Sequence, residues 1–146
     1  MCNYCGCIEF PLVKQLIEEH EAIEDAAGRL RSLVEQGRVQ EARQQLNVLV
    51  DLLASHVAIE EGGLFAELRK DGMLAAEVEQ LCVQHTDMHE ALGAVTGPFP
   101  DWEAVLAAVD VLRQHILDEE YDLFPAAAMS LPISTWDRIT PALQTG

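Results

Sequence analysis

The sequence predicts an all-α protein, folded as an antiparallel up-down-up-down four-helix bundle. Apolar residues recur at helical spacing through most of the 146 residues, whereas alternating runs of β-branched residues with hairpin turns are missing. The helical stretches are long and the connections between them are short, so consecutive helices should be antiparallel neighbours.

The first two helices have recognisable ends. The first should begin near Pro11, because a first helical turn tolerates proline, and it should end at Gly37. The second should run from residue 39 to residue 70 and stop at Asp71–Gly72.

The remaining helices are also bounded by sequence signals. The third is expected over residues 74–96, because the Gly-Pro-Phe-Pro stretch at 97–100 would break it. Asp101 is a suitable N-cap for the fourth helix, which should continue to Met129. A short fifth helix is expected after Ser134.

Composition and charge indicate one domain and exclude some partners. A chain of 146 residues that is 49% hydrophobic can bury one core, and we expect residues 11–146 to form the bundle domain behind a cysteine-rich arm at residues 1–10. The net charge of −16 disfavours nucleic acid and anionic membrane surfaces as partners. The chain lacks a long apolar run and a secretory signal pattern, so we expect a cytoplasmic protein.

An internal repeat relates the second helix to the fourth. The segments His56–Phe65 and His115–Phe124 share a histidine, two glutamates, a leucine and a phenylalanine at the same offsets. A weaker similarity relates His20–Ile23 to His89–Leu92. A bundle built from two similar helix pairs has a pseudo-twofold axis, and equivalent polar residues should converge on it.

All five histidines and two glutamates are expected in one layer of the bundle. At a rise of about 1.5 Å per residue, seven side chains on the four helices reach similar heights. They are His20, His56, Glu60, His85, His89, His115 and Glu119. Burying so many polar groups is costly without a compensating partner, and a metal ion provides one. Imidazole with carboxylate suits iron, zinc, manganese or copper, and two shared carboxylates suit a bridged pair of ions.

This pattern resembles the hemerythrin-like, or HHE cation-binding, family over residues 11–129. The residues that carry the resemblance are His20, His56-x-x-x-Glu60, His85-x-x-x-His89, and His115 followed by Glu119 and Glu120. The resemblance implies a non-haem di-iron centre whose two iron ions are bridged by two carboxylates and an oxo or hydroxo group. It implies that His20 and His56 bind one iron, that His85, His89 and His115 bind the other, and that Glu60 bridges. The iron with fewer ligands would keep a position open for a small ligand.

Two adjacent residues compete for the second bridge. Related proteins place this carboxylate four or five residues after the last histidine, which here means Glu119 or Glu120. The repeat and the helical phase favour Glu119, because Glu120 would point about 140° away from His115 on a regular helix. Glu120 and Tyr121 are the candidate catalytic residues, since either could deliver a proton to a peroxide.

The resemblance implies a protein that binds or reduces O₂, NO or H₂O₂, for example in defence against oxidative or nitrosative stress. A reductant, either a thiol or an electron-transfer protein, would then be a partner. The chain has neither a glycine-rich phosphate loop nor a nucleophile elbow, in agreement with a small ligand. Two alternatives stay open: a reversible O₂ or NO carrier or sensor, and an iron store or donor for the repair of iron–sulfur centres.

Two further features of the sequence need an explanation. Cys2, Cys5 and Cys7 crowd the start of the chain, and they could cycle between thiol and disulfide, bind metal or be inert. We expect a redox accessory outside the di-iron site. The adjacent Gly62–Gly63 pair costs about 2 kcal/mol relative to alanine inside a helix. It could leave room for Tyr121, open a path for a small molecule, or mark a local irregularity.

Overall fold

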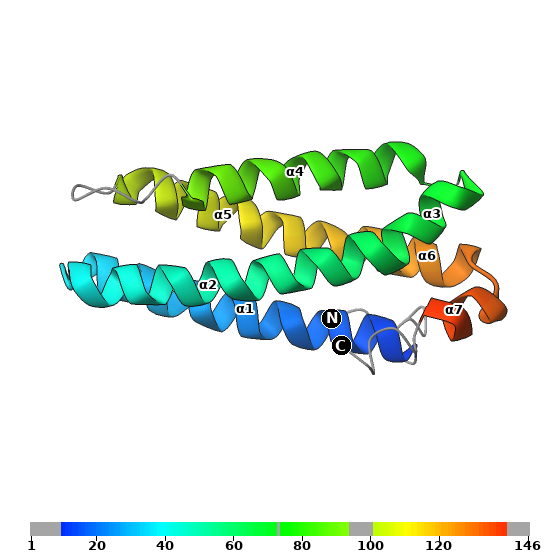
Figure 1. Ribbon diagram of the computed structural model, residues 1–146, viewed down its shortest axis with the longest axis horizontal. Helices are drawn as coiled ribbons and strands as arrows, with labels where there is room; N and C mark the ends of the chain where they lie inside the picture. Colours follow the sequence, from blue (N-terminus) through cyan, green and yellow to red (C-terminus); the bar gives the residue numbers. More distant parts are fainter. Residues whose placement is uncertain (1–9, 73, 94–100, 140–146) are drawn as a thin grey trace.

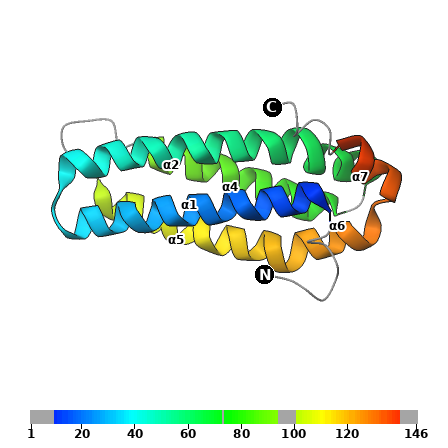
Figure 2. The ribbon, with the colours of Figure 1, turned by 90° about the horizontal axis from the view of Figure 1, so that it is seen from below.

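The computed structural model describes residues 10–72, 74–93 and 101–139, and it confirms the all-α bundle (Figure 1). Helix α1 (Pro11–Glu35) pairs with α2 (Val39–Glu60), and α4 (Ala75–Gly93) pairs with α5 (Trp102–Asp118). Helix α1 also packs against α5, and α2 packs against α4, so the four helices form a closed ring. Figure 2 shows α1 flanked by α2 and α5.

The helix ends follow the predicted signals. Pro11 is the first residue of α1. Gly37, just after the end of this helix, has a φ of 72°, a left-handed conformation that glycine adopts without steric cost. Gly72, also with a φ of 72°, ends α3 (Ala66–Asp71) in the same way. Asp101 caps α5, because its carboxylate accepts a hydrogen bond from the Ala104 backbone N–H at 3.1 Å. The last residues of the predicted third helix, 94–96, lie outside the described ranges.

Two π-helical turns interrupt the second and fourth predicted helices. The turn η2 (Glu61–Phe65) joins α2 to α3, and η3 (Glu119–Leu123) joins α5 to α6 (Phe124–Ser130). The two turns occupy equivalent places in the internal repeat. A π turn contains one extra residue per turn, and such turns are frequent at functional sites because they change where the following side chains point.

The Gly62–Gly63 pair lies inside η2 and marks a local irregularity. A Cβ atom added at either glycine would meet nothing within 4 Å, so neither position makes room for a neighbouring side chain such as Tyr121. The interpretation that the pair accommodates Tyr121 is therefore wrong. Tyr121 and Asp122 occupy the equivalent positions of η3, which adopts the same π turn with side chains present.

The apolar core consists of two clusters separated by a polar layer. One cluster, at the end of the bundle that contains α3 and α6, includes Phe65 and Trp136. The other, at the opposite end, includes Leu49 and Leu112. Between them lie the histidines and glutamates of the predicted layer, so the polar groups are enclosed by apolar packing on both sides.

The short helix α7 (Ile133–Ile139) covers one end of the bundle and confirms the predicted fifth helix (Figure 1). Its Trp136 is buried and stacks on Phe10 with a ring-centroid distance of 4.6 Å. Arg138 pairs with Glu67 of α3 at 2.7 Å. None of the helices in the described ranges has the length and apolar character needed to cross a membrane.

Candidate metal centre

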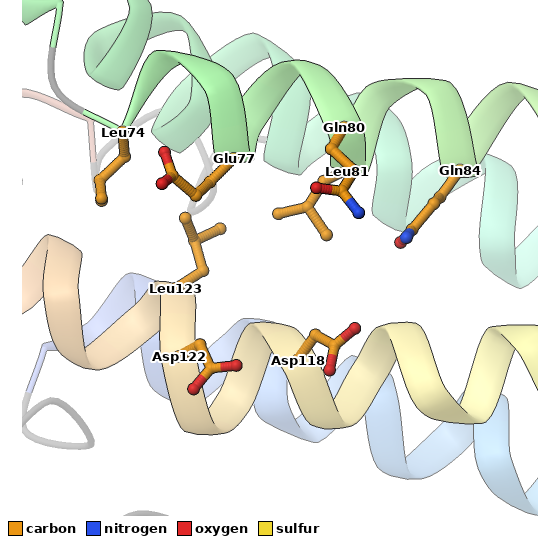
Figure 3. A pocket seen from close by; sticks show the side chains of 8 residues that line it. All are labelled: Leu74, Glu77, Gln80, Leu81, Gln84, Asp118, Asp122 and Leu123. Atoms are coloured by element: carbon orange, nitrogen blue, oxygen red, sulfur yellow. The ribbon is translucent and has the colours of Figure 1, made fainter.

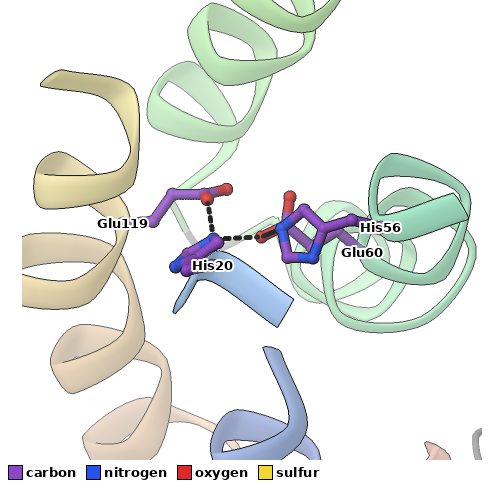
Figure 4. A group of neighbouring side chains, drawn as sticks. All are labelled: His20, His56, Glu60 and Glu119. Carbon is purple, nitrogen blue, oxygen red and sulfur yellow. Dashed lines mark hydrogen bonds and ion pairs between the residues drawn. The ribbon is translucent and has the colours of Figure 1, made fainter. Parts of the chain in front are cut away.

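Six polar side chains from all four helices meet in the layer between the two clusters, and none is more than 3% exposed. They are His20, His56, Glu60, His85, His115 and Glu119. Their possible ligand atoms form two groups, within each of which all atoms lie within 4.8 Å of one another. One group contains His20 and His56, the other contains His85 and His115, and both contain the two glutamates. Figure 4 shows the first group.

Each glutamate directs one oxygen toward each pair of histidines. Oε2 of Glu60 lies 3.1 Å from Nε2 of His56, and Oε1 lies 3.3 Å from Nε2 of His85. Oε1 of Glu119 lies 3.0 Å from Nε2 of His20, and Oε2 lies 3.3 Å from Nε2 of His115. The two carboxylates therefore span the two groups, as bridging ligands must.

The donor atoms at the centre of the layer fit a metal. Among the described residues, nothing hydrogen-bonds to four buried atoms: both oxygens of Glu60, Oε2 of Glu119 and Nε2 of His56. Buried polar atoms are ordinarily paired, so several unpaired lone pairs in one place indicate that a cation completes them. Imidazole nitrogen with carboxylate oxygen is a donor set for iron, zinc, manganese or copper.

The four histidines of the two groups each use the second ring nitrogen, Nδ1, to bond a neighbouring side chain. We call that side chain the outer partner of the histidine. A carboxylate or amide oxygen accepts each hydrogen bond, so Nδ1 carries the proton and Nε2 faces the centre. The pairs are His20–Glu120 at 2.8 Å, His56–Glu19 at 2.7 Å, His85–Glu61 at 2.8 Å and His115–Gln84 at 2.7 Å. Such bonds fix the tautomer and the ring orientation of metal-binding histidines.

Two phenylalanines cover the centre in equivalent ways. The ring of Phe124 stacks on His20 with a centroid distance of 5.8 Å and an interplanar angle of 8°. Phe65 stacks on His85 at 5.7 Å and 0°. Because Phe65 and Phe124 are the last members of the internal repeat, the pseudo-twofold relation predicted from the sequence extends to the walls of the site.

The structure brings six of the seven predicted ligands together, but His89 is in neither group of candidate ligands. His89 is half-buried, and it lies one helical turn beyond His85, a rise of about 6 Å that takes it out of the layer. The weak repeat had aligned His20 with His89. The contacts instead make His85 the counterpart of His20. Glu19, which precedes His20, bonds His56 on the next helix, and Gln84, which precedes His85, bonds His115 on the next helix.

Glu119 and Glu120 occupy different places although they are adjacent. Glu119 is fully buried between the two groups, whereas the Glu120 side chain is 13% exposed and bonds Nδ1 of His20. Glu120 belongs to the π turn η3, where the 140° offset of a regular helix does not apply, and it reaches the outer ring nitrogen of His20. Tyr121 is 53% exposed, and its role in proton delivery stays a prediction.

Three outer partners were not predicted from the sequence: Glu19, Glu61 and Gln84. Each stands directly beside a buried candidate ligand in the sequence: Glu19 before His20, Gln84 before His85 and Glu61 after Glu60. Polar residues adjacent to predicted ligands were the available signal. Adjacent residues on one helix can contact histidines of two different helices, which the spacing within a single helix does not reveal.

The charges of the site strongly affect its proton affinities in the metal-free protein. Burial lowers the pKa of His20, but hydrogen bonds to Glu119 and Glu120 outweigh this effect and raise the pKa to about 11. Burial also opposes the charged form of His56, whose pKa is nevertheless raised to about 9, chiefly by Glu60. Protons therefore compete with metal ions for these ligands, and metal binding should release protons.

The metal-free protein should lose stability as the pH rises from 6.5 toward 9. The pKa of His56 is about 9 in the folded protein against 6.5 for a free histidine, so its contribution is complete below pH 6.5 and is lost as the pH passes 9. Urea denaturation of chelator-treated protein across this range measures the loss. The metal-loaded protein is the control, because a bound ion replaces the proton. An unchanged free energy of unfolding in the metal-free protein would contradict the expectation.

The cysteines lie outside the centre or outside the described residues. Cys2, Cys5 and Cys7 belong to residues 1–9, which the structure does not describe. Cys82 is partly buried, its Sγ lies 3.1 Å from Nη2 of Arg69, and burial together with the charge of Glu61 raises the pKa of its thiol. Cys82 is in neither group of candidate metal ligands.

The fold and the site together define a helical-bundle metal-binding protein. The family model of the hemerythrin HHE cation-binding domain matches residues 12–127, and the chain belongs to this family. Searches among curated proteins and among solved structures gave no significant match.

Proposed function

We propose that the protein binds two iron ions per chain and uses them to bind or reduce a small ligand, O₂, NO or H₂O₂, in defence against oxidative or nitrosative stress. The observation that carries the proposal is the pair of buried carboxylates, each with one oxygen toward either histidine pair. We call the site of His20 and His56 the first position and that of His85 and His115 the second position. Glu60 and Glu119 would bridge them.

The surroundings of the centre support a small ligand. The six side chains are at most 3% exposed, and the rings of Phe65 and Phe124 stack on two of the histidines, so only a compact molecule would reach the ions. Iron, when bound, supplies electrons and Lewis acidity. The protein supplies fixed imidazoles and two anionic carboxylates in a site of low polarity, where charges interact more strongly than in water.

Metal analysis and ligand spectra test the proposal. Anaerobically purified protein loaded with Fe(II) should contain two iron ions per chain, and its absorption spectrum should change on exposure to O₂, NO or H₂O₂. The physical reason is that the six ligands form two groups that share both glutamates. One ion or none after loading would overturn the dinuclear site, and a spectrum that responds to none of the three would overturn the ligand proposal.

A matched pair of variants on α4 serves as the control. His85→Ala removes a buried ligand and should lower the iron content, whereas His89→Ala lies one turn away and should leave two ions bound. Equal losses in the two variants would restore the five-histidine site that the sequence predicted.

A further inference from the structure

The outer partners of the two positions differ in charge. Both histidines of the first position bond carboxylates, those of Glu19 and Glu120. In the second position one histidine bonds the carboxylate of Glu61, and the other bonds the neutral amide of Gln84. The pseudo-twofold symmetry of the centre is therefore broken at one pair of equivalent residues, Glu19 and Gln84.

Glu19 and Gln84 accept hydrogen bonds of the same length, so the difference between these two side chains is their charge. Oε1 of Glu19 lies 2.7 Å from Nδ1 of His56, and Oε1 of Gln84 lies 2.7 Å from Nδ1 of His115. A carboxylate that accepts the Nδ1–H bond makes the imidazole a stronger donor to a metal than an amide does. Its negative charge also attracts the cation directly. Both effects strengthen the first position relative to the second.

Solvent exposure adds to this difference. The side chains behind the first position are 25% exposed for Glu19 and 13% exposed for Glu120. Glu61, the carboxylate behind the second position, is 37% exposed. Water and salt screen exposed charges more strongly, so Glu61 is the most screened of the three outer carboxylates. The second position therefore has fewer outer carboxylates than the first, and its one carboxylate is the more screened.

The second position is also connected to a surface pocket. Gln84 lies at one end of a pocket of about 430 Å³ between α4 and the α5–η3 segment, whose walls carry Glu77, Asp118 and Asp122 (Figure 3). Gln84 bonds His115, so one side chain links this pocket to a ligand of the second position. This stretch of surface is hollowed and carries carboxylates that attract cations.

We propose that the two positions bind their ions with unequal strength, and that the choice of Glu19 and Gln84 sets the difference. The first position is filled first and retains its ion, whereas the second is filled later and exchanges its ion more readily. Glu19 and Gln84 are positioning residues, because they act on the metal through His56 and His115. This inference rests on the proposed dinuclear site and adds an order of loading to it.

Zinc titration of the metal-free full-length protein tests the proposal without redox chemistry. Competition with a chelator should resolve two dissociation constants that differ at least about tenfold, the range in which outer partners act. Gln84→Glu should tighten the weaker step and bring the constants together, whereas Glu19→Gln should bring them together by weakening the tighter step. These changes are nearly isosteric, so each serves as the other's control for folding.

The order of filling is read by NMR of protein with ¹⁵N-labelled histidines at one equivalent of zinc. The resonances of His20 and His56 should shift first in the wild type. In the double variant Glu19→Gln with Gln84→Glu, those of His85 and His115 should shift first. Equal constants in the wild type, or constants that Gln84→Glu leaves unchanged, would overturn this inference while two bound ions still support the dinuclear site. Fewer than two zinc ions bound would instead overturn the dinuclear site itself.

Discussion

Glu119→Gln should reduce the metal content to at most one ion per chain and abolish the absorption of the proposed bridged iron pair. Glu119 is fully buried and directs one oxygen to each histidine pair. A glutamine has no negative charge and only one oxygen, so it cannot bridge two cations, and its amide group would lie among imidazoles without the charge that offsets their burial. Metal analysis and the absorption spectrum of the iron-loaded variant measure both effects.

Glu120→Gln is the matched control for this substitution. Glu120 is the neighbouring residue in the same π turn, but it bonds Nδ1 of His20 from outside the centre. The amide oxygen of a glutamine can still accept this hydrogen bond. We expect both ions to remain, bound with an affinity lower by about 10- to 100-fold, as is typical when an outer partner is changed. The opposite pattern, with loss of the bridged spectrum only in Glu120→Gln, would assign the bridge to Glu120.

Phe65→Ala should destabilise the metal-free protein by about 3–5 kcal/mol, the usual cost of removing a buried aromatic ring. Phe65 is 0% exposed, belongs to one of the two apolar clusters and stacks on His85. The substitution leaves a cavity beside the polar layer and removes the wall that holds the His85 ring. Urea denaturation of chelator-treated protein gives the free energy of unfolding without a contribution from bound metal.

Met129→Ala provides the reference for Phe65→Ala. Met129 is 82% exposed, so its truncation should change the free energy of unfolding by no more than about 0.5 kcal/mol. If Phe65→Ala cost no more than this surface substitution, Phe65 would not be the packing residue that the structure indicates.

The candidate ligands are arranged symmetrically in the two groups. The resemblance implied two histidines on one iron and three on the other, with an open position only on the first. The structure groups two histidines with both glutamates on each side. Among the described residues, the two groups therefore differ in their outer partners, where Gln84 stands in place of a carboxylate, and not in the number of histidines.

Local patterns in the sequence were enough to predict the helices, the repeat and most of the candidate ligands. Helical periodicity and the stop signals at Gly37 and Gly72 depend on local backbone preferences, which do not require contacts with other helices. The spacing of His56 with Glu60, and of His115 with Glu119, places each pair on one helix face whatever the rest of the bundle does. Six of the seven predicted ligands accordingly meet in the buried layer.

Other details depend on how the helices dock, and they follow only from the packing of the bundle. The choice between His85 and His89, which share a helix face, depends on the height at which α4 packs against α2 and α5, and a shift of one turn exchanges them. The contact of Glu120 with His20 is made from the π turn η3, which regular helical phase does not predict. The outer partners are contacts between residues of different helices, 24 to 100 positions apart in the chain, so no local spacing could reveal them.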